Sequence, residues 1–129
     1  MRIRLTSIMV NDQDQALKFY TEVLGFQKKQ EFPMGPYKWL TVTSPEDPIE
    51  LELSLEPNAN PDGKTFQEAM FAQKIPLAAF ETADIDADYK RLSSLGVVFL
   101  SEPRQAGPVK IAHFSDTCGN LILLYQPPS

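Results

Sequence analysis

The chain has 129 residues, and 43% of them are hydrophobic, which suits one compact domain with a substantial core. Its net charge of −5 and scattered basic residues argue against partners such as nucleic acid or an anionic membrane surface. Cys118 is the only cysteine, which excludes an internal disulfide and a multi-cysteine zinc site and agrees with a cytoplasmic location. No segment approaches the roughly 20 apolar residues of a membrane-spanning helix.

The chain opens with a predicted strand and a predicted helix. Residues 3–10 alternate in the manner of a strand. Residues 14–26, DQALKFYTEVLGF, predict a short amphipathic helix, because apolar side chains recur at spacings of three and four. Asp12 or Asp14 can cap the start of this helix, and Gly25 is the residue type at which a helix usually stops.

Three strands and a linker come next. Strands are predicted at residues 27–32, 39–43 and 49–55, and the last of these, IELELSL, alternates strictly. Residues 56–64 are rich in Pro, Asn and Gly and predict a loop. Residues 65–73 predict a short helix, because they begin with a capping-box pattern.

The second half of the chain repeats the order of elements in the first half. The helix stop Leu24–Gly25 recurs as Leu95–Gly96, at the end of a predicted helix over residues 84–95. Residues 105–108 are interpreted either as a flap or as a plain connection. The predicted strands are residues 76–81, 97–100, 109–114 and 121–126. The sequence therefore predicts an internal repeat.

We interpret residues 1–129 as one domain made of two modules. The modules are residues 1–57 and 74–129, joined by a linker with a short helix over residues 58–73. Half of this chain is too small to bury its own sheet face, so the two modules are expected to associate as a pseudo-symmetric pair.

Three phrases of the sequence resemble a known family. VNDQDQALKFYTEVLGF, IELEL and FSDTCGNLILLY resemble the vicinal-oxygen-chelate superfamily, which contains glyoxalase I, bleomycin-resistance proteins and extradiol dioxygenases. The resemblance covers essentially the whole chain. It implies an α+β fold in which two βαβββ modules form a curved, mixed-sheet cup with the helices on its convex face. It also implies a small-molecule ligand and a homodimer.

The resemblance also implies where a divalent metal ion would be held. Enzymes of the superfamily use ligands from the first and fourth strand of each module, and these positions fall on Leu5, Glu50, Pro76 and Leu123, with Glu52 as a register alternative to Glu50. Leucine and proline side chains cannot donate to a metal, and a catalytic metal site needs about three protein ligands. We therefore predict that the usual metal site is absent and expect no cofactor.

The alternation within the strands predicts the lining of the cup. Glu50 and His113 are the candidate catalytic groups, because carboxylate and imidazole groups can exchange protons near neutral pH. An ordinary solvated or hydrogen-bonded side chain is the alternative for both. The candidate ligand-binding residues are mostly apolar or aromatic, and they are Leu5, Ser7, Met9, Trp39, Glu52, Phe80, Leu123 and Tyr125.

These observations predict a glyoxalase/bleomycin-resistance/dioxygenase-type protein that binds or transforms a small, partly apolar molecule without a metal ion. Whether it is an enzyme is left open at this point. The alternative is a metal-dependent, glyoxalase I-like lyase or a dioxygenase whose ligands have moved to Glu50, Glu52 and His113. A third interpretation is a structural or regulatory dimer whose cup is filled by its own side chains.

Overall fold

The computed structural model describes residues 1–129, which form two compact units, Met1–Gln67 and Glu68–Ser129. The first unit contains β1 (Leu5–Val10), α1 (Gln13–Lys18), the π-helical segment η1 (Phe19–Val23), β2 (Gln27–Met34), β3 (Tyr37–Thr43) and β4 (Glu52–Pro57). Helix α2 (Pro61–Ala72) spans the boundary. The second unit contains β5 (Ala78–Glu81), α3 (Ile85–Ser94), β6 (Arg104–Ala106), β7 (Val109–Ser115) and β8 (Leu121–Gln126).

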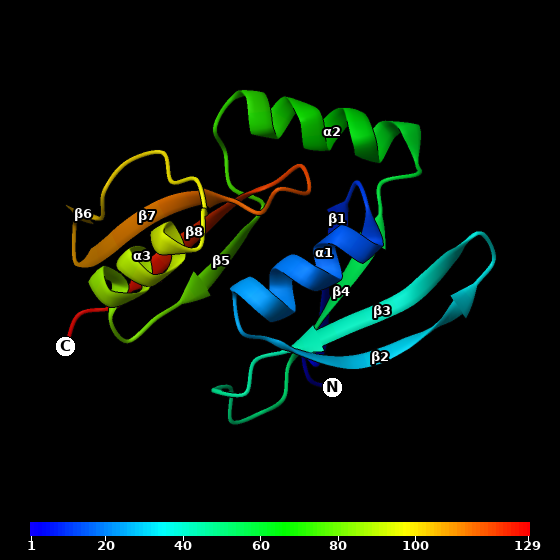
Figure 1. Ribbon diagram of the computed structural model, residues 1–129, viewed down its shortest axis with the longest axis horizontal. Helices are drawn as coiled ribbons and strands as arrows, with labels where there is room; N and C mark the ends of the chain where they lie inside the picture. The colour runs from blue at the N-terminus through cyan, green and yellow to red at the C-terminus, as the bar shows by residue number, and fades with distance from the viewer. The chain divides into compact units, whose positions relative to one another are not determined.

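Each unit is a βαβββ module with one four-stranded mixed sheet (Figure 1). The strand order is β1-β4-β3-β2 in the first sheet and β5-β8-β7-β6 in the second. In both sheets the first strand pairs in parallel with the last strand of its module, and the other pairs are antiparallel. The predicted α+β class with two βαβββ modules is confirmed.

One face of the first sheet forms the core of its unit with the helix. The side chains of α1 and η1 that lie against it, Ala16, Phe19 and Tyr20, are almost completely buried. Alternate residues of β1, β3 and β4 share this face, because successive side chains of a strand point to opposite sides. These buried residues are Ile8, Val10, Leu40, Val42 and Leu55.

Helix α1 begins at a side-chain cap and ends in a wider turn than the sequence predicted. Of the two candidates, Asp12 is the cap, since its Oδ1 accepts from the Gln15 backbone N–H at 3.0 Å. Asp84 caps α3 in the same way. The predicted regular helix changes to π geometry at Phe19, whose carbonyl accepts from the Leu24 N–H at 3.0 Å, five residues on.

Gly25 and Gly96 end the two helices with φ of 86° and 89°, a region that costs other residues roughly 1–2 kcal/mol. An added Cβ would meet nothing within 4 Å at either position, so substitution would cost backbone strain alone. We expect Gly25→Ala to lower the free energy of unfolding by about 1 kcal/mol. Gly25→Asn should cost less, because asparagine tolerates this conformation better. Urea denaturation of the two variants measures both values, and equal stability of wild type and Gly25→Ala would contradict the assignment.

Strand β4 begins later than the strict alternation predicted. Its register with β1 starts at the pair Leu5–Glu52, and the Glu52 N–H donates to the Arg4 carbonyl at 3.0 Å. Glu50 lies outside the strand with φ of 50°. The predicted strand over residues 49–55 is therefore wrong at its start, because pairing with β1 sets where the ladder begins.

Helix α2 begins earlier than predicted, at Pro61 and not at residue 65. Asn60 Oδ1 accepts from the backbone N–H groups of Asp62 and Gly63 at 2.9 and 3.2 Å. Proline is favoured at the first helical position, because its fixed φ suits a helix and its missing N–H would have no partner there. In the first turns of α2, the buried Gln67 side chain donates to the Met9 carbonyl at 2.9 Å, which ties the helix to the end of β1.

The second unit has a comparable core, with α3 against one face of its sheet (Figure 1). The predicted strand over residues 97–100 is only a single bridge between Phe99 and Phe114. The loop predicted over residues 105–108 is partly ordered as strand β6, which forms a hairpin with β7. The buried apolar residues of this core are Ile85, Leu92, Ala112, Phe114, Ile122 and Leu124.

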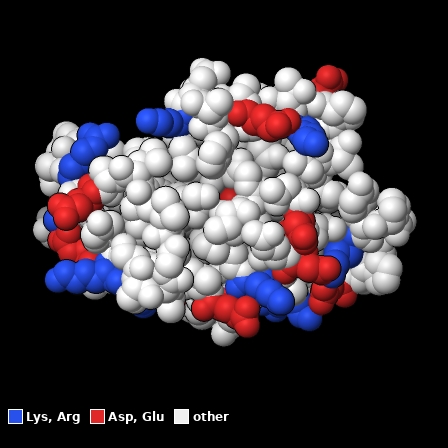
Figure 2. Space-filling model, turned by 45° about the horizontal axis from the view of Figure 1, so that its top comes forward, with Lys and Arg blue, Asp and Glu red and all other residues white.

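The charged side chains on the surface are mixed in sign. Figure 2 shows Lys and Arg side chains adjoining Asp and Glu side chains at several places on one face of the molecule. Lys38 is an example, since its Nζ lies 2.6 Å from Asp14 Oδ1 and 2.9 Å from Glu31 Oε2. None of the helices is long and apolar enough to cross a bilayer.

Candidate functional site

The face of the first sheet that points away from α1 carries a mixed set of polar and aromatic side chains. The strand register places Leu5 beside Glu52, Thr41 beside Ser54, and Phe32 beside Trp39. This set, called here the polar–aromatic face, consists of Leu5, Ser7, Met9, Gln30, Phe32, Trp39, Thr41, Glu52 and Ser54. Five of the predicted ligand-binding residues, Leu5, Ser7, Met9, Trp39 and Glu52, thus share one face.

Glu52 is the hydrogen-bonded carboxylate of this face, and Glu56, the partner of Met9, is a second and exposed carboxylate on the same side. Its Oε1 accepts a hydrogen bond from Gln30 Nε2 at 2.6 Å and another from Thr41 Oγ1 at 2.7 Å. The hydrogen bond from Gln30 has the largest effect on the Glu52 carboxyl, followed by the bond from Thr41. Together they hold the pKa of this carboxyl below its usual value and outweigh the opposing effect of desolvation. Glu52 is therefore an ionised, oriented carboxylate at neutral pH.

An aromatic pair lies farther along the same face. The rings of Phe32 and Trp39 are stacked, with centroids 6.4 Å apart and an interplanar angle of 28°. Phe32 is 46% exposed, and Trp39 is partly exposed. Met34 and Tyr37, the next pair in the β2–β3 hairpin, are also exposed. The polar–aromatic face thus offers apolar and aromatic surface beside a fixed negative charge.

The residues at the four metal positions do not fit a divalent ion. Leu5 and Leu123 offer only hydrocarbon, and the side chain of Pro76 has no donor atom. Glu50, the fourth, is outside β4, and its Oε1 lies 3.4 Å from Lys29 Nζ, with 65% of the side chain exposed. The partner of Leu5 across the strands is Glu52 and not Glu50.

The corresponding face of the second sheet carries three of the predicted residues. His113 pairs with Leu123, and Tyr125 pairs with both Ile111 and Glu81. Phe80 pairs with Leu124, a core residue. The sequence-based register of β5 placed Phe80 on the same face as Leu123 and Tyr125, and the structure places it on the other face.

His113 is held largely neutral by its surroundings. Burial lowers the pKa of its imidazole, and the positive charge of Arg104 adds to this effect. Tyr125 Oη lies 3.4 Å from Glu81 Oε1 on the same face, within weak hydrogen-bonding distance. His113 can therefore accept or donate a hydrogen bond at neutral pH, and its role in catalysis stays a prediction.

Gln30 and Phe32 were missed by the sequence analysis, which placed no side chain of the second strand on this face. A usable signal was present in the Gly35–Pro36 pair. Gly35 has φ of 63°, and a two-residue loop there pairs Met34 with Tyr37 and Phe32 with Trp39. Pro33 lies inside β2, where it is tolerated because β2 is an edge strand.

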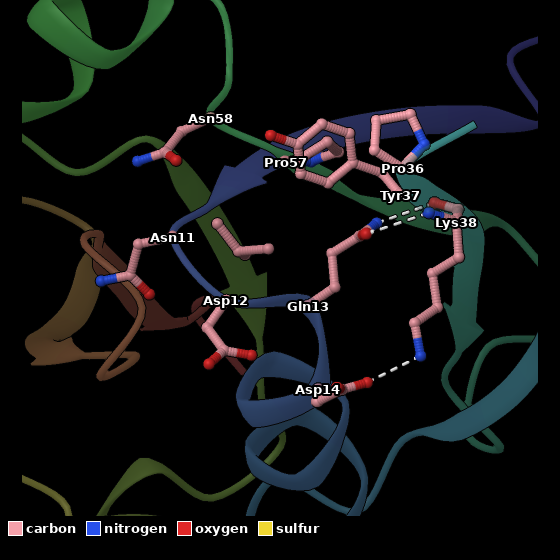
Figure 3. A pocket seen from close by; sticks show the side chains of 10 residues that line it. Asn11, Asp12, Gln13, Asp14, Pro36, Tyr37, Lys38, Pro57 and Asn58 are labelled. Carbon is pink, nitrogen blue, oxygen red and sulfur yellow. Dashed lines mark hydrogen bonds and ion pairs between the residues drawn. The ribbon is translucent and has the colours of Figure 1, made fainter. Parts of the chain in front are cut away.

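A separate hollow of about 360 Å³ lies beside the start of α1, between the ends of β1 and β4 and the start of β3 (Figure 3). Its charged groups are already engaged, since Lys38 Nζ is paired with Asp14 and Asp12 caps the helix. The side chain of Gln13 spans this region, and Figure 3 shows it bonded to the backbone of Lys38. We assign this hollow a structural role and no ligand.

The ion pairs next to this hollow predict a pH dependence of stability. Two hydrogen bonds, the more effective one from Lys28 and the other from Lys38, lower the pKa of Glu31 from 4.5 to about 2. Because the pKa of Glu31 is lower in the folded state than in the unfolded state, its carboxylate stabilises the fold at any pH above the unfolded-state pKa. This contribution is lost as the pH falls from about 4.5 to 2. We expect Glu31→Gln to remove up to about 1 kcal/mol at neutral pH, because the pairs are partly exposed. Wild type and variant should converge in stability at acidic pH, as urea denaturation across this range would show.

Comparison with known proteins agrees with this geometry. The profile of the Glyoxalase/Bleomycin resistance protein/Dioxygenase superfamily matches residues 2–124. The chain therefore belongs to this superfamily, as the sequence resemblance implied. The Bacillus subtilis (strain 168) protein YurT is 51% identical to it over 126 residues, which cover 98% of this chain and 99% of YurT.

Two solved structures are similar over nearly the whole chain. UcmS2 superposes with a TM-score of 0.81 at 32% identity, covering 97% of both chains. TnmS3, an antibiotic binding protein from Streptomyces sp. CB03234, superposes with a TM-score of 0.75 at 30% identity and covers 98% of this chain and 96% of its own. The chain therefore shares its fold with a protein that is described as antibiotic binding.

Proposed function

We propose that the protein binds a small, partly apolar organic molecule, without using a metal ion, on the sheet faces that point away from α1 and α3. The observation that carries this proposal is the polar–aromatic face, where exposed aromatic rings lie beside an ionised, oriented carboxylate. A few placed polar groups within an apolar lining are typical of small-molecule sites. TnmS3 is described as an antibiotic binding protein, and its likeness to this chain supports a binding role.

The absence of metal chemistry is part of the proposal. It is supported by the donor set, because three of the four expected ligand positions, Leu5, Pro76 and Leu123, hold no donor side chain. Glu50 and His113 are retained as candidate catalytic groups only if turnover is observed. The alternative is a metal-dependent lyase or dioxygenase whose ligands have moved, with Glu50, Glu52 and His113 as the candidates.

Thermal denaturation with three planar aromatic probes tests binding. We would use acridine, proflavine and anthraquinone-2-sulfonate, each with and without a chelator. A molecule that binds only the folded state raises its stability by about 2.7 kcal/mol at a hundredfold excess over the dissociation constant. We expect at least one probe to raise the midpoint and the chelator to leave the shift unchanged. Stoichiometric divalent metal in the purified protein, or a shift abolished by the chelator, would favour the alternative.

We further propose that the protein is a homodimer located in the cytoplasm. The superfamily resemblance supports pairing, and large hydrophobic side chains outside the polar–aromatic face, such as Ile49, Phe66 and Leu95, are about half exposed in the single chain. The single, buried Cys118 suits a reducing compartment. Light scattering after size exclusion should give twice the chain mass of 14.5 kDa. A mass of one chain would remove the dimer from the proposal.

A further inference from the structure

The two oxygens of Glu52 are not equivalent. Oε1 accepts both hydrogen bonds, from Gln30 Nε2 at 2.6 Å and from Thr41 Oγ1 at 2.7 Å. Both donors are neutral, so they orient the carboxylate without neutralising it. A carboxylate can accept about four hydrogen bonds. Oε2 therefore has capacity for a donor that comes from outside the chain.

The geometry of this carboxylate is fixed before any ligand binds. Thr41 is completely buried and Gln30 is partly buried, so neither donor moves freely. Both come from strands of the same sheet, β3 and β2, with Thr41 and Gln30 as cross-strand partners. Groups that are already held in the bound geometry lose less conformational entropy on binding.

No cation of the chain forms an ion pair with Glu52. Lys29 and Arg4 act on it only through space and make small contributions to its lowered pKa. Lys29 Nζ is paired instead with Glu50 Oε1 at 3.4 Å. A cation placed on this partly buried carboxylate is attracted more strongly than it would be in open solvent.

The aromatic pair lies at a distance that one ligand can span. Trp39 is two residues along β3 from Thr41, which corresponds to about 7 Å. Phe32 stacks on Trp39 on the same face. Rings of this kind stack with planar molecules, and their faces also attract cations.

We propose that the polar–aromatic face selects cationic, planar aromatic molecules, with the cationic group on Glu52 Oε2 and the ring system against Trp39 and Phe32. This inference rests on the proposed function, because it assigns a ligand class to the same face. A neutral aromatic molecule makes the stacking contact and leaves the carboxylate without a partner. An anion is repelled by the charge of Glu52.

Fluorescence titration with two matched probes tests the inference. Near pH 8 proflavine is a cation and acridine is a neutral molecule of the same ring system, while Glu52 is ionised. We expect proflavine to bind at least about tenfold more tightly than acridine, as a hydrogen bond between charged groups implies. Added salt should weaken proflavine binding and leave acridine binding unchanged, because screening acts on the charge alone.

Three variants test which side chains cause the preference for proflavine over acridine. Glu52→Gln keeps the shape and should weaken proflavine about tenfold without changing acridine binding. Trp39→Leu should weaken both probes. Glu46→Gln, in the exposed turn before β4, is the matched control and should change neither. The salt series on the wild-type protein keeps the test decisive if a variant fails to fold.

The outcomes separate this inference from the proposed function. Equal binding of acridine and proflavine, or unchanged proflavine binding by Glu52→Gln, would overturn the charge selectivity and leave the proposed function standing. Binding of neither probe would overturn the ligand class and would count against the proposed binding face as well.

Discussion

We expect Asp116→Ala to lower the free energy of unfolding by about 3 kcal/mol, because the substitution leaves several buried donors without an acceptor. Asp116 is completely buried in the turn between β7 and β8. Its Oδ1 accepts from the backbone N–H groups of Cys118 at 2.8 Å and Asn120 at 3.0 Å. Its Oδ2 accepts from Asn120 Nδ2 at 2.8 Å.

Urea denaturation of Asp116→Ala and Asp116→Asn measures this contribution. Asparagine keeps one acceptor oxygen for the two backbone donors but places its amide nitrogen near Asn120 Nδ2. Asp116→Asn should therefore lie between wild type and Asp116→Ala in stability. A loss below about 0.5 kcal/mol for Asp116→Ala, the range of ordinary surface substitutions, would contradict the role of this turn.

Gln13→Ala should destabilise the fold by about 2 kcal/mol, because its buried amide joins the start of α1 to two strands. Gln13 Nε2 donates to the carbonyls of Lys38 and Leu55, both at 2.8 Å. Its Oε1 accepts from the Lys38 N–H at 3.2 Å. We expect the lower part of the range for lost buried hydrogen bonds, because water in the adjacent hollow can reach some of the freed groups.

Gln13→Glu sharpens this measurement, since glutamate has the same shape and no donor at neutral pH. Its carboxylate would face the carbonyl oxygens of Lys38 and Leu55, so the loss should equal or exceed that of alanine. Gln73→Ala, at an exposed position after α2, is the control and should stay within about 0.5 kcal/mol of wild type. If Gln13→Ala and Gln73→Ala were equally stable, the amide would not hold the helix to the sheet.

The helices could be predicted because their ends are set by local chemistry. Asp12 and Asp84 satisfy free N–H groups of the first turn, and Gly25 and Gly96 take up left-handed backbone at the last. Such signals lie within a few residues of the feature that they determine. Asn60 and Pro61 carried the same kind of signal for α2, but the sequence analysis placed the start of that helix later.

The strand ends and faces could not be predicted in the same way. The start of β4 depends on Arg4 and Leu5, which are far away in the sequence. A register error of one residue moves a side chain to the other face of the sheet, which is what separates Phe80 from its predicted position. Local alternation in IELELSL could not show that Glu50 lies outside the strand while Glu52 lies within it.

The candidate site was predicted in part for the same reason. Glu52 and Trp39 were assigned to the binding face because they alternate with core residues in strands that the sequence defines well. Gln30 was missed, since its place depends on the pairing of β2 with β3, in which it lies opposite Thr41. Polar residues occur on both sides of β2, so the sequence of this strand alone does not show which side points away from α1.

The parallel contact between the first and last strand of each module also orders its folding. Strands β2 and β3 are joined by a two-residue turn and can pair early, because only a short loop has to close. Strand β1 can be added in parallel only when β4 has been formed, so most of the module must be in place first. We therefore expect β1 and β5 to be the last strands of their sheets to form and the first from which unfolding begins.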